Sequence, residues 1–300
     1  MNLMLNSTKT LVIGLSAGIV TVLGSYLIKK WLNNEETSTI NDPQKPNKKK
    51  KPDKKTSVPA VDYSKLAPAI STRNPQLGVL LKFINEKSAF KEEQEHLKKS
   101  GCLLNVITVL WQTSNPDIKI VCYKIVTNIS TNPDMLQEFV KPVIPLLCEA
   151  LAQEQEDVEI LRNILNLLVN ITSHQDIIIS EYNLRAIPQI LSLYTPQINY
   201  QYDIVLSCLK ILINMTCSDM VFDLTLVYMT SIHLLHGCKN NAIILRVLTL
   251  LRNILKSGTL KHDCKFDDEL MRGIGTVLSS SEDNDNLEIA NQIYRLISDH

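Results

Sequence analysis

Five asparagines recur at a near-constant interval in this 300-residue sequence, and a carboxamide both donates and accepts hydrogen bonds. They are Asn85, Asn128, Asn170, Asn214 and Asn253, at intervals of 43, 42, 44 and 39 residues. The sequence contains no G-x-x-x-x-G-K-[ST], G-x-G-x-x-G, H-E-x-x-H or G-x-S-x-G motif. His233, His236 and Cys238 lie close together, but no second group of ligands follows at metal-binding spacing. We therefore expect a binding protein without enzymatic activity, metal or cofactor.

The segments between the asparagines repeat a pattern of apolar helical runs. Between Asn128 and Asn170, a polar break at 131–134 precedes a short apolar segment at 135–140 and a second run at 143–151. The second run begins among prolines, which the first turn of a helix tolerates. Residues 155–157 then supply acidic side chains to the start of a long helix. Its apolar residues at helical spacing predict one buried stripe: Ile160, Leu161, Ile164, Leu165, Leu168 and Val169. A helical unit with a period of about 40 to 47 residues is typical of armadillo or HEAT-type arrays.

This three-part unit resembles the armadillo repeat. The resemblance rests on the opening of the second helix, such as Ile187-Pro188, and on the asparagine near the end of the third. It covers about residues 72–300 and implies an all-α fold, a right-handed armadillo-type helical solenoid of about six repeats. The last repeat, around Leu296, lacks the asparagine, as expected of an atypical terminal repeat.

The third helices of an armadillo array line an extended binding surface. In the family, the asparagine of the third helix often contacts the backbone of an extended peptide, and the five asparagines match that position. The alternative is that these side chains satisfy backbone groups within the stack. Import receptors of this fold often carry a tryptophan four residues earlier, whereas this chain has Leu81, Lys124, Asn166, Lys210 and Thr249 there. We therefore do not expect it to read basic import signals.

Basic residues on these helices predict a groove with local positive charge and an acidic partner segment. They are Lys124, Lys210, Arg162, Arg246 and Arg252. Nucleic acid is not an expected partner, because residues 71–300 hold 20 basic and 26 acidic side chains and duplex binding depends on neutralising phosphates.

The beginning of the chain has a different composition. After a short tail at 1–10, residues 11–28 are 18 uncharged residues, and as a helix they would be about 27 Å long, close to the roughly 30 Å hydrocarbon core of a bilayer. No small-residue cleavage site follows this segment and residues 1–31 contain no arginine, so we expect a retained transmembrane anchor. Gly14 and Gly18 have a spacing that lets two membrane helices pack closely, although glycine is common in such helices anyway. The oligomeric state therefore stays open.

Residues 29–71 are rich in lysine and proline and predict a disordered linker. Their lysines give residues 1–70 a net charge of +6, against −6 for the rest. The lysine cluster has three interpretations: attraction to anionic lipids, a nuclear import signal, or a solvated spacer.

The location of the lysines predicts that the repeats face the cytosol, since positive flanks stay inside. The seven cysteines form no C-x-x-C motif and most lie within apolar runs, which is typical of a reducing compartment. Three formal glycosylation triplets begin at Asn128, Asn170 and Asn214. Because each coincides with the end of a packed helix, we attribute them to structure.

An N-terminal anchor, a basic linker and about six repeats together resemble the armadillo repeat-containing X-linked and armadillo repeat-containing protein ten family. The similarity is closest over Ile243–Ile254, IILRVLTLLRNI. The resemblance implies a protein of the mitochondrial outer membrane that faces the cytosol and acts in mitochondrial transport or dynamics with the Miro and TRAK/Milton machinery. An anchor in the endoplasmic reticulum, or a nuclear adaptor in signalling, transcription or growth, is the alternative.

Overall fold

The computed structural model describes residues 63–153, 157–174, 184–216, 224–257 and 264–298, and every regular element in them is a helix. The predicted membrane segment at 11–28, with Gly14 and Gly18, lies outside these residues. Within them, none of the helices has the length and apolar character needed to cross a bilayer. The chain divides into two compact units, up to Ile125 and from Val126 onward.

The first unit begins earlier than the sequence predicts. Tyr63 and Ala67 are buried although they fall within the predicted linker, which places the first helical turns before residue 72. The Tyr63 hydroxyl donates to Glu93, and the Asn105 side chain donates to the Ala67 carbonyl over 2.7 Å. These partners lie 30 and 38 residues away, so the linker composition could not indicate them. Its elements are α2 (Tyr63–Leu66), η1 (Ala67–Ala69), α3 (Leu77–Ser88), α4 (Lys91–Lys99), α5 (Cys102–Gln112) and α6 (Pro116–Ile129) up to Ile125.

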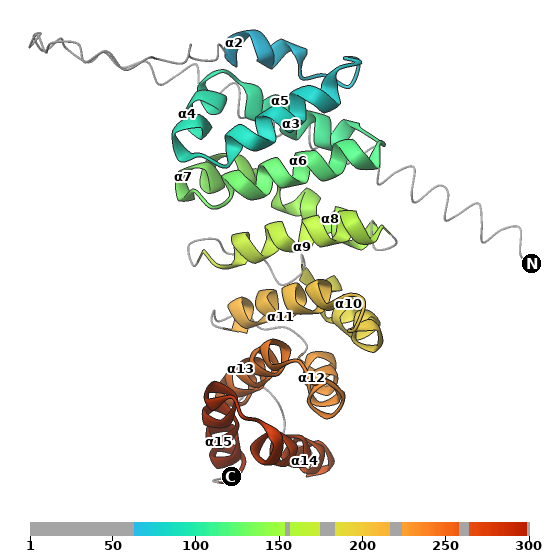
Figure 1. The fold of residues 1–300 in the computed structure, drawn as a ribbon, viewed down its shortest axis with the longest axis vertical. Coiled ribbons are helices and arrows are strands. Elements are labelled where there is room, and N and C mark those ends of the chain that lie inside the picture. The colour runs from blue at the N-terminus through green and yellow to red at the C-terminus, as the bar shows by residue number, and fades with distance from the viewer. Residues whose placement is uncertain (1–62, 154–156, 175–183, 217–223, 258–263, 299–300) are drawn as a thin grey trace, which may run out of the picture. The chain divides into compact units, whose positions relative to one another are not determined.

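The second unit contains the regular repeats, arranged as two adjoining layers of helices (Figure 1). One layer holds the third helices of successive repeats: α9 (Val158–Thr172), α11 (Tyr202–Thr216), α13 (Asn241–Ser257) and α15 (Asn284–Ser298). The other holds the second helices: α8 (Ile144–Gln153), α10 (Ala186–Tyr194), α12 (Thr225–Gly237) and α14 (Cys264–Ser280). The short elements are α7 (Pro133–Met135), η2 (Leu136–Val140), η3 (Lys141–Val143) and η5 (Thr195–Gln197).

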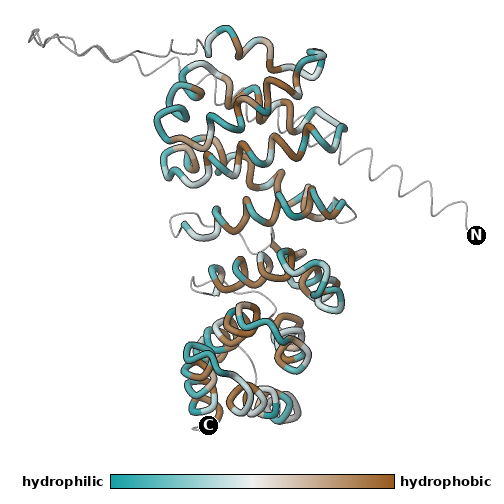
Figure 2. Tube along the Cα trace, viewed as in Figure 1, coloured by the Kyte–Doolittle hydropathy of each residue, from teal (hydrophilic) through white to brown (hydrophobic). Residues whose placement is uncertain are grey.

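The helices begin and pack as their sequences indicate. Asp157 caps α9, because its carboxylate accepts from the amides of Glu159 and Ile160 at 3.1 Å. The predicted stripe of α9 is buried apart from Val169, which is half-buried. Apolar residues follow the facing sides of both layers in Figure 2. Burying them provides the main driving force of the fold.

The terminal repeat departs from the others at one buried position. Ile160, Ile204 and Ile243 lie ten residues before the repeated asparagine and are almost fully buried. Asn286 takes this position in α15 and is also fully buried, yet neither its amide nitrogen nor its oxygen has a hydrogen-bond partner among the described residues. An unsatisfied buried carboxamide is destabilising, so the last repeat is a weak point of the stack.

The described cysteines behave as small apolar residues. Cys102, Cys122, Cys148 and Cys208 are buried free thiols, and Cys238 is half-buried. Burial raises the pKa of Cys122 and of Cys148 to about 12, and it also raises the pKa of Cys208. These thiols therefore stay protonated and unreactive at neutral pH.

Candidate partner-binding face

The repeated asparagines of the second unit form hydrogen bonds between successive third helices. Asn170 donates its side-chain amide to the Thr127 carbonyl at 3.2 Å and to Ser130 Oγ at 3.0 Å. Asn214 donates to a hydroxyl in the same way one repeat later, to Thr172 Oγ1 at 3.1 Å. Asn253 repeats it again, to Thr216 Oγ1 at 3.2 Å. We call the three bonds to the hydroxyl groups of Ser130, Thr172 and Thr216 the asparagine ladder.

The ladder explains the glycosylation triplets. In each one, the hydroxyl residue two positions after an asparagine accepts the hydrogen bond from the asparagine of the next repeat. Asn170, for example, donates to the preceding repeat while Thr172 accepts from the following one. One triplet therefore serves both neighbours, which gives it a structural reason to recur.

Whether these asparagines also contact a bound peptide stays a prediction. Asn85 lies half-buried on α3 in the first unit, and Asn128 lies half-buried at the end of α6.

Neighbouring third helices share a constant register, which three side-chain contacts define. Arg162 of α9 lies eight residues before Asn170 and pairs with Asp203 of α11, which lies eleven residues before Asn214. Ser207 Oγ donates to Asn166 Oδ1 at 3.2 Å. Ser207 lies seven residues before Asn214, and Asn166 lies four residues before Asn170. In both pairs, the residue on the later helix lies three positions further from its own asparagine than its partner on the earlier helix does.

The same offset holds between α13 and α15. Arg252, one residue before Asn253, donates to Gln292 Oε1 at 3.3 Å. Gln292 lies four residues before Leu296, which takes the ladder position in α15.

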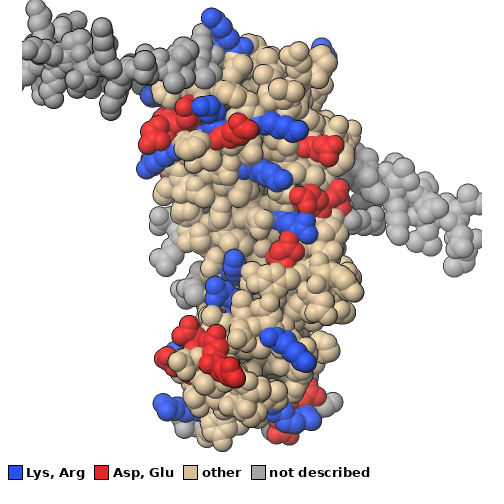
Figure 3. All heavy atoms as spheres, in the orientation of Figure 1, with Lys and Arg blue, Asp and Glu red and all other residues tan. Residues whose placement is uncertain are grey.

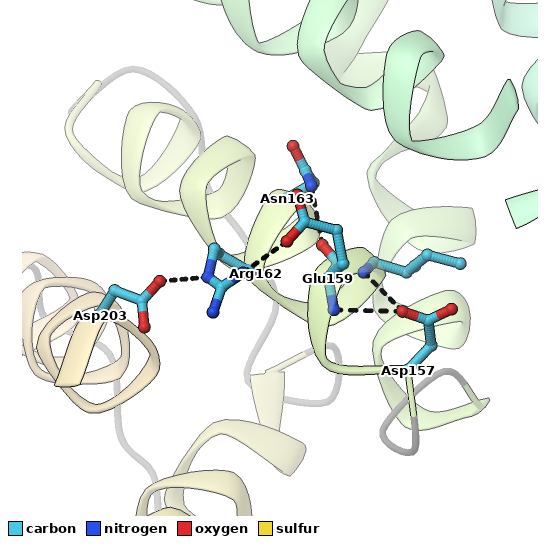
Figure 4. Close-up of polar contacts among 6 residues, drawn as sticks. Asp157, Glu159, Arg162, Asn163 and Asp203 are labelled. Carbon is cyan, nitrogen blue, oxygen red and sulfur yellow. Dashed lines mark hydrogen bonds and ion pairs between the residues drawn. The ribbon is translucent and has the colours of Figure 1, made fainter. Parts of the chain in front are cut away.

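Arg162 does not provide free positive charge, because two carboxylates neutralise it. Its guanidinium pairs with Asp203 of α11 and with Glu159 one turn earlier on its own helix. Figure 4 shows the arginine lying between these two acids, with Asn163 and the capping Asp157 beyond Glu159. Desolvation alone would lower the pKa of Arg162, but the hydrogen bond and charge of Asp203, together with Glu159, raise it. The sequence predicts Arg162 as part of a basic groove, whereas in the structure it forms an inter-repeat ion pair.

The remaining predicted cations have different surroundings. Lys124 is exposed on α6 within the first unit. Lys210 on α11 and Arg246 on α13 are half-buried, and neither has a carboxylate within ion-pair distance among the described residues. We call the exposed side of α9, α11, α13 and α15 the third-helix face; the predicted cations of the second unit that lack an acidic partner among the described residues lie on α11 and α13.

An open hollow of about 340 Å³ lies between α13 and α15 on this face. Residues of both charges line it: Arg246, Thr249 and Arg252 from α13, and Asp285, Glu288 and Gln292 from α15. Figure 3 shows basic and acidic side chains interspersed on the side of the second unit that it presents. The predicted groove is therefore mixed in charge. The sequence alone does not place the acids Asp203, Asp285 and Glu288 on this face, because their position there depends on the register between repeats.

The histidines near Cys238 lie at the end of α12. His233 and His236 are exposed, and His236 Nε2 lies 3.1 Å from the Glu269 carbonyl of α14. No group of three potential metal ligands occurs among the residues that the structure describes.

Comparisons with known proteins agree with this architecture. A family model described as Armadillo-like matches residues 74–188. No curated protein matches the chain. Among solved structures, a designed armadillo repeat protein in complex with the peptide (KR)4 is 12% identical, with a TM-score of 0.59, covering 79% of this chain and 100% of its own.

A second similar structure is a computationally designed armadillo repeat protein for modular peptide recognition. It is 11% identical, with a TM-score of 0.61, and covers 78% of this chain and 99% of its own. At such identities the likeness establishes the fold alone, and this fold is typically a non-enzymatic scaffold. The described residues thus have an all-helical, armadillo-like solenoid fold.

Proposed function

We propose that this chain is a membrane-tethered adaptor of the mitochondrial outer membrane, whose repeats bind partner proteins in the cytosol and serve mitochondrial transport, distribution or dynamics. The observation that carries the binding role is the third-helix face, where Lys210, Arg246 and an adjoining hollow remain available for a ligand. A designed protein of the same fold is solved with a bound peptide, which supports the same use of this surface.

The proposed tether rests on the sequence before the repeats. Residues 11–28 are uncharged and long enough to cross a bilayer, and lysines follow them on the side that the repeats occupy. The resemblance to the armadillo repeat-containing X-linked family supports the mitochondrial outer membrane and suggests Miro and TRAK/Milton proteins as partners.

The asparagine ladder supports a cytosolic location. A glycan is attached to the side-chain nitrogen of asparagine, which is the atom that Asn170 and Asn214 use to donate to the preceding repeat. Glycosylation in a secretory compartment would replace a donor hydrogen and place a bulky group between two packed helices. A chain that needs these nitrogens for stacking is suited to a compartment without that modification.

Imaging of tagged chains tests the proposal. The full chain with a C-terminal tag should label mitochondrial rims, and a chain lacking residues 1–31 should lose them. A matched control that lacks residues 36–59 keeps the anchor and should retain the rims. A reticular pattern from the full chain would favour the endoplasmic reticulum, and a nuclear signal would favour the nuclear adaptor; either result would refute the mitochondrial proposal.

Proximity labelling in the same cells identifies the partners. Enrichment of Miro or TRAK proteins by the full chain, lost on deletion of residues 1–31, is the expected result. If the rims are present but these proteins are not enriched, the location stands and the partner assignment is wrong.

A further inference from the structure

The register of the third helices places two cations opposite each other between α11 and α13. Asn253 donates to Thr216 just as Asn214 donates to Thr172, so α11 and α13 stack in the same register as α9 and α11. Between α9 and α11, Asn166, which lies four residues before Asn170, contacts Ser207, which lies seven residues before Asn214. The residues at these two positions in the later pair are Lys210 and Arg246.

This pair differs in charge from the other cross-helix contacts. The equivalent pair between α9 and α11 is a neutral hydrogen bond, and Arg162 on the same face is paired with acids. Lys210 and Arg246 instead bring two positive charges together without a carboxylate within ion-pair distance in the described part of the chain. Like charges on adjoining helices repel, and both side chains are half-buried, so water screens them incompletely. An anionic group between them would remove the repulsion and gain charge-assisted hydrogen bonds from both.

The hollow one helix further along contains two acidic side chains in addition to Arg246 and Arg252. Asp285 and Glu288 are exposed on α15 and line the hollow together with Arg246. Neither acid is paired with a cation within ion-pair distance among the residues described. Arg252 does not neutralise them directly, because its side chain donates to Gln292. A positive and a negative position therefore occupy successive seams of the same face.

We propose that the third-helix face binds an extended peptide that places an acidic side chain between Lys210 and Arg246 and a basic side chain beside Asp285 and Glu288. Packed helices lie about 8–10 Å apart, and an extended chain advances about 3.3 Å per residue, so the two charged residues are separated by about three positions. The inference rests on the proposed function, in which this face is the protein-binding surface, and it adds the charge pattern of the partner.

A bipolar peptide fits better than a polyanion. Nucleic acid carries a negative charge at every nucleotide, so a strand bound at Lys210 and Arg246 would bring further phosphates close to Asp285 and Glu288. A purely basic peptide meets the opposite difficulty at the cation pair. A segment with both signs satisfies both positions.

Fluorescence anisotropy with synthetic peptides tests this pattern. The probes are labelled alanine- and serine-based peptides that carry a glutamate pair and a lysine pair about three residues apart, in both orders, and the protein is the full chain in detergent. Controls of the same length carry only glutamates or only lysines, and an RNA oligonucleotide serves as a polyanion. One of the two bipolar peptides should bind most tightly, and added salt should weaken its binding.

Two double variants locate the site. K210E/R246E should weaken the bipolar peptide at least about tenfold, and K210M/R246M, which removes charge but keeps length, should weaken it by a similar factor. K239E changes a charge of the same sign at an exposed residue between α12 and α13 and should leave binding within about twofold. Circular dichroism identifies any variant that has lost its fold, and the methionine variant then decides.

Three results would overturn the inference: wild-type binding by folded K210M/R246M, tighter binding of the RNA or the all-lysine peptide than of either bipolar peptide, or no binding of any peptide. The proposed function fails separately, by imaging. If mitochondrial rims persist while no bipolar peptide binds, the peptide pattern is wrong and the proposed location stands.

Discussion

Replacing Asn170 by alanine should destabilise the second unit by about 1–2 kcal/mol. The substitution removes two hydrogen bonds to the preceding repeat, at 3.2 and 3.0 Å, and each contributes about 0.5–1.5 kcal/mol net. The higher helix propensity of alanine offsets about 0.5 kcal/mol of this loss. Urea unfolding followed by far-UV circular dichroism measures the difference on the full chain.

A double-mutant cycle separates the hydrogen bond from other effects of the substitution. Ser130 is fully buried and accepts from Asn170, so N170A and S130A should be coupled by about 1 kcal/mol. Since repeat arrays can unfold in parts, hydrogen exchange should show faster opening at the ends of α6 and α9 in N170A.

The matched control is N291A. Asn291 is exposed and donates within its own helix, to the Leu287 carbonyl, so its loss should change stability by less than about 0.5 kcal/mol. If N170A were as stable as N291A and showed no coupling with S130A, the ladder would not hold the repeats together.

Two further substitutions, a thiol-labelling experiment and a pH profile have defined outcomes. N286I restores the apolar residue of the other repeats and removes an unsatisfied buried amide, so it should raise the free energy of unfolding by about 1–2 kcal/mol; an unchanged urea midpoint would contradict this. D203N removes an ion pair whose acid is 45% exposed, so water and salt screen the pair. The substitution should lower the free energy of unfolding by less than about 1 kcal/mol, and by less still in high salt; a larger loss that does not depend on salt would contradict this. Cys122 and Cys148 should resist iodoacetamide at pH 8 in the folded chain while Cys238 reacts first among the described thiols, as site-resolved mass spectrometry would show. Because folding raises the pKa of the two buried thiols from 9.0 to about 12, stability should be fully present below about pH 9 and fall as pH rises toward 12. A flat stability profile across this range would contradict the assigned burial.

Local signals explain what the sequence could predict. The period of the asparagines, the acidic cap at Asp157 and the buried stripe of α9 all depend on residues within one or two helices of each other. The helical repeat architecture could therefore be predicted, and the coincidence of the glycosylation triplets with helix ends already indicated a structural origin for them.

Features that depend on contacts between repeats were not accessible in the same way. The pairing of Arg162 with Asp203 joins residues 41 positions apart, and it reverses the expected contribution of that arginine to a basic groove. The early start at Tyr63 likewise depends on Glu93. The available signal for the ladder acceptors was the hydroxyl residue two positions after Asn128, Asn170 and Asn214, but the sequence does not show which side chain donates to which repeat.

The ladder also has a direction and a matched end. Each middle repeat donates a hydrogen bond to the repeat before it and accepts one from the repeat after it. Asn253 is followed by Leu255 rather than a hydroxyl residue, and the next helix has Leu296 in place of the donor, so both partners of the next bond are absent together. The series of ladder bonds therefore ends without leaving a donor or an acceptor of its own unused. The repeats ending at Thr172 and Thr216 are therefore interchangeable building units, and a duplicated copy inserted between them would extend the array, whereas a copy added after Leu255 would meet no acceptor.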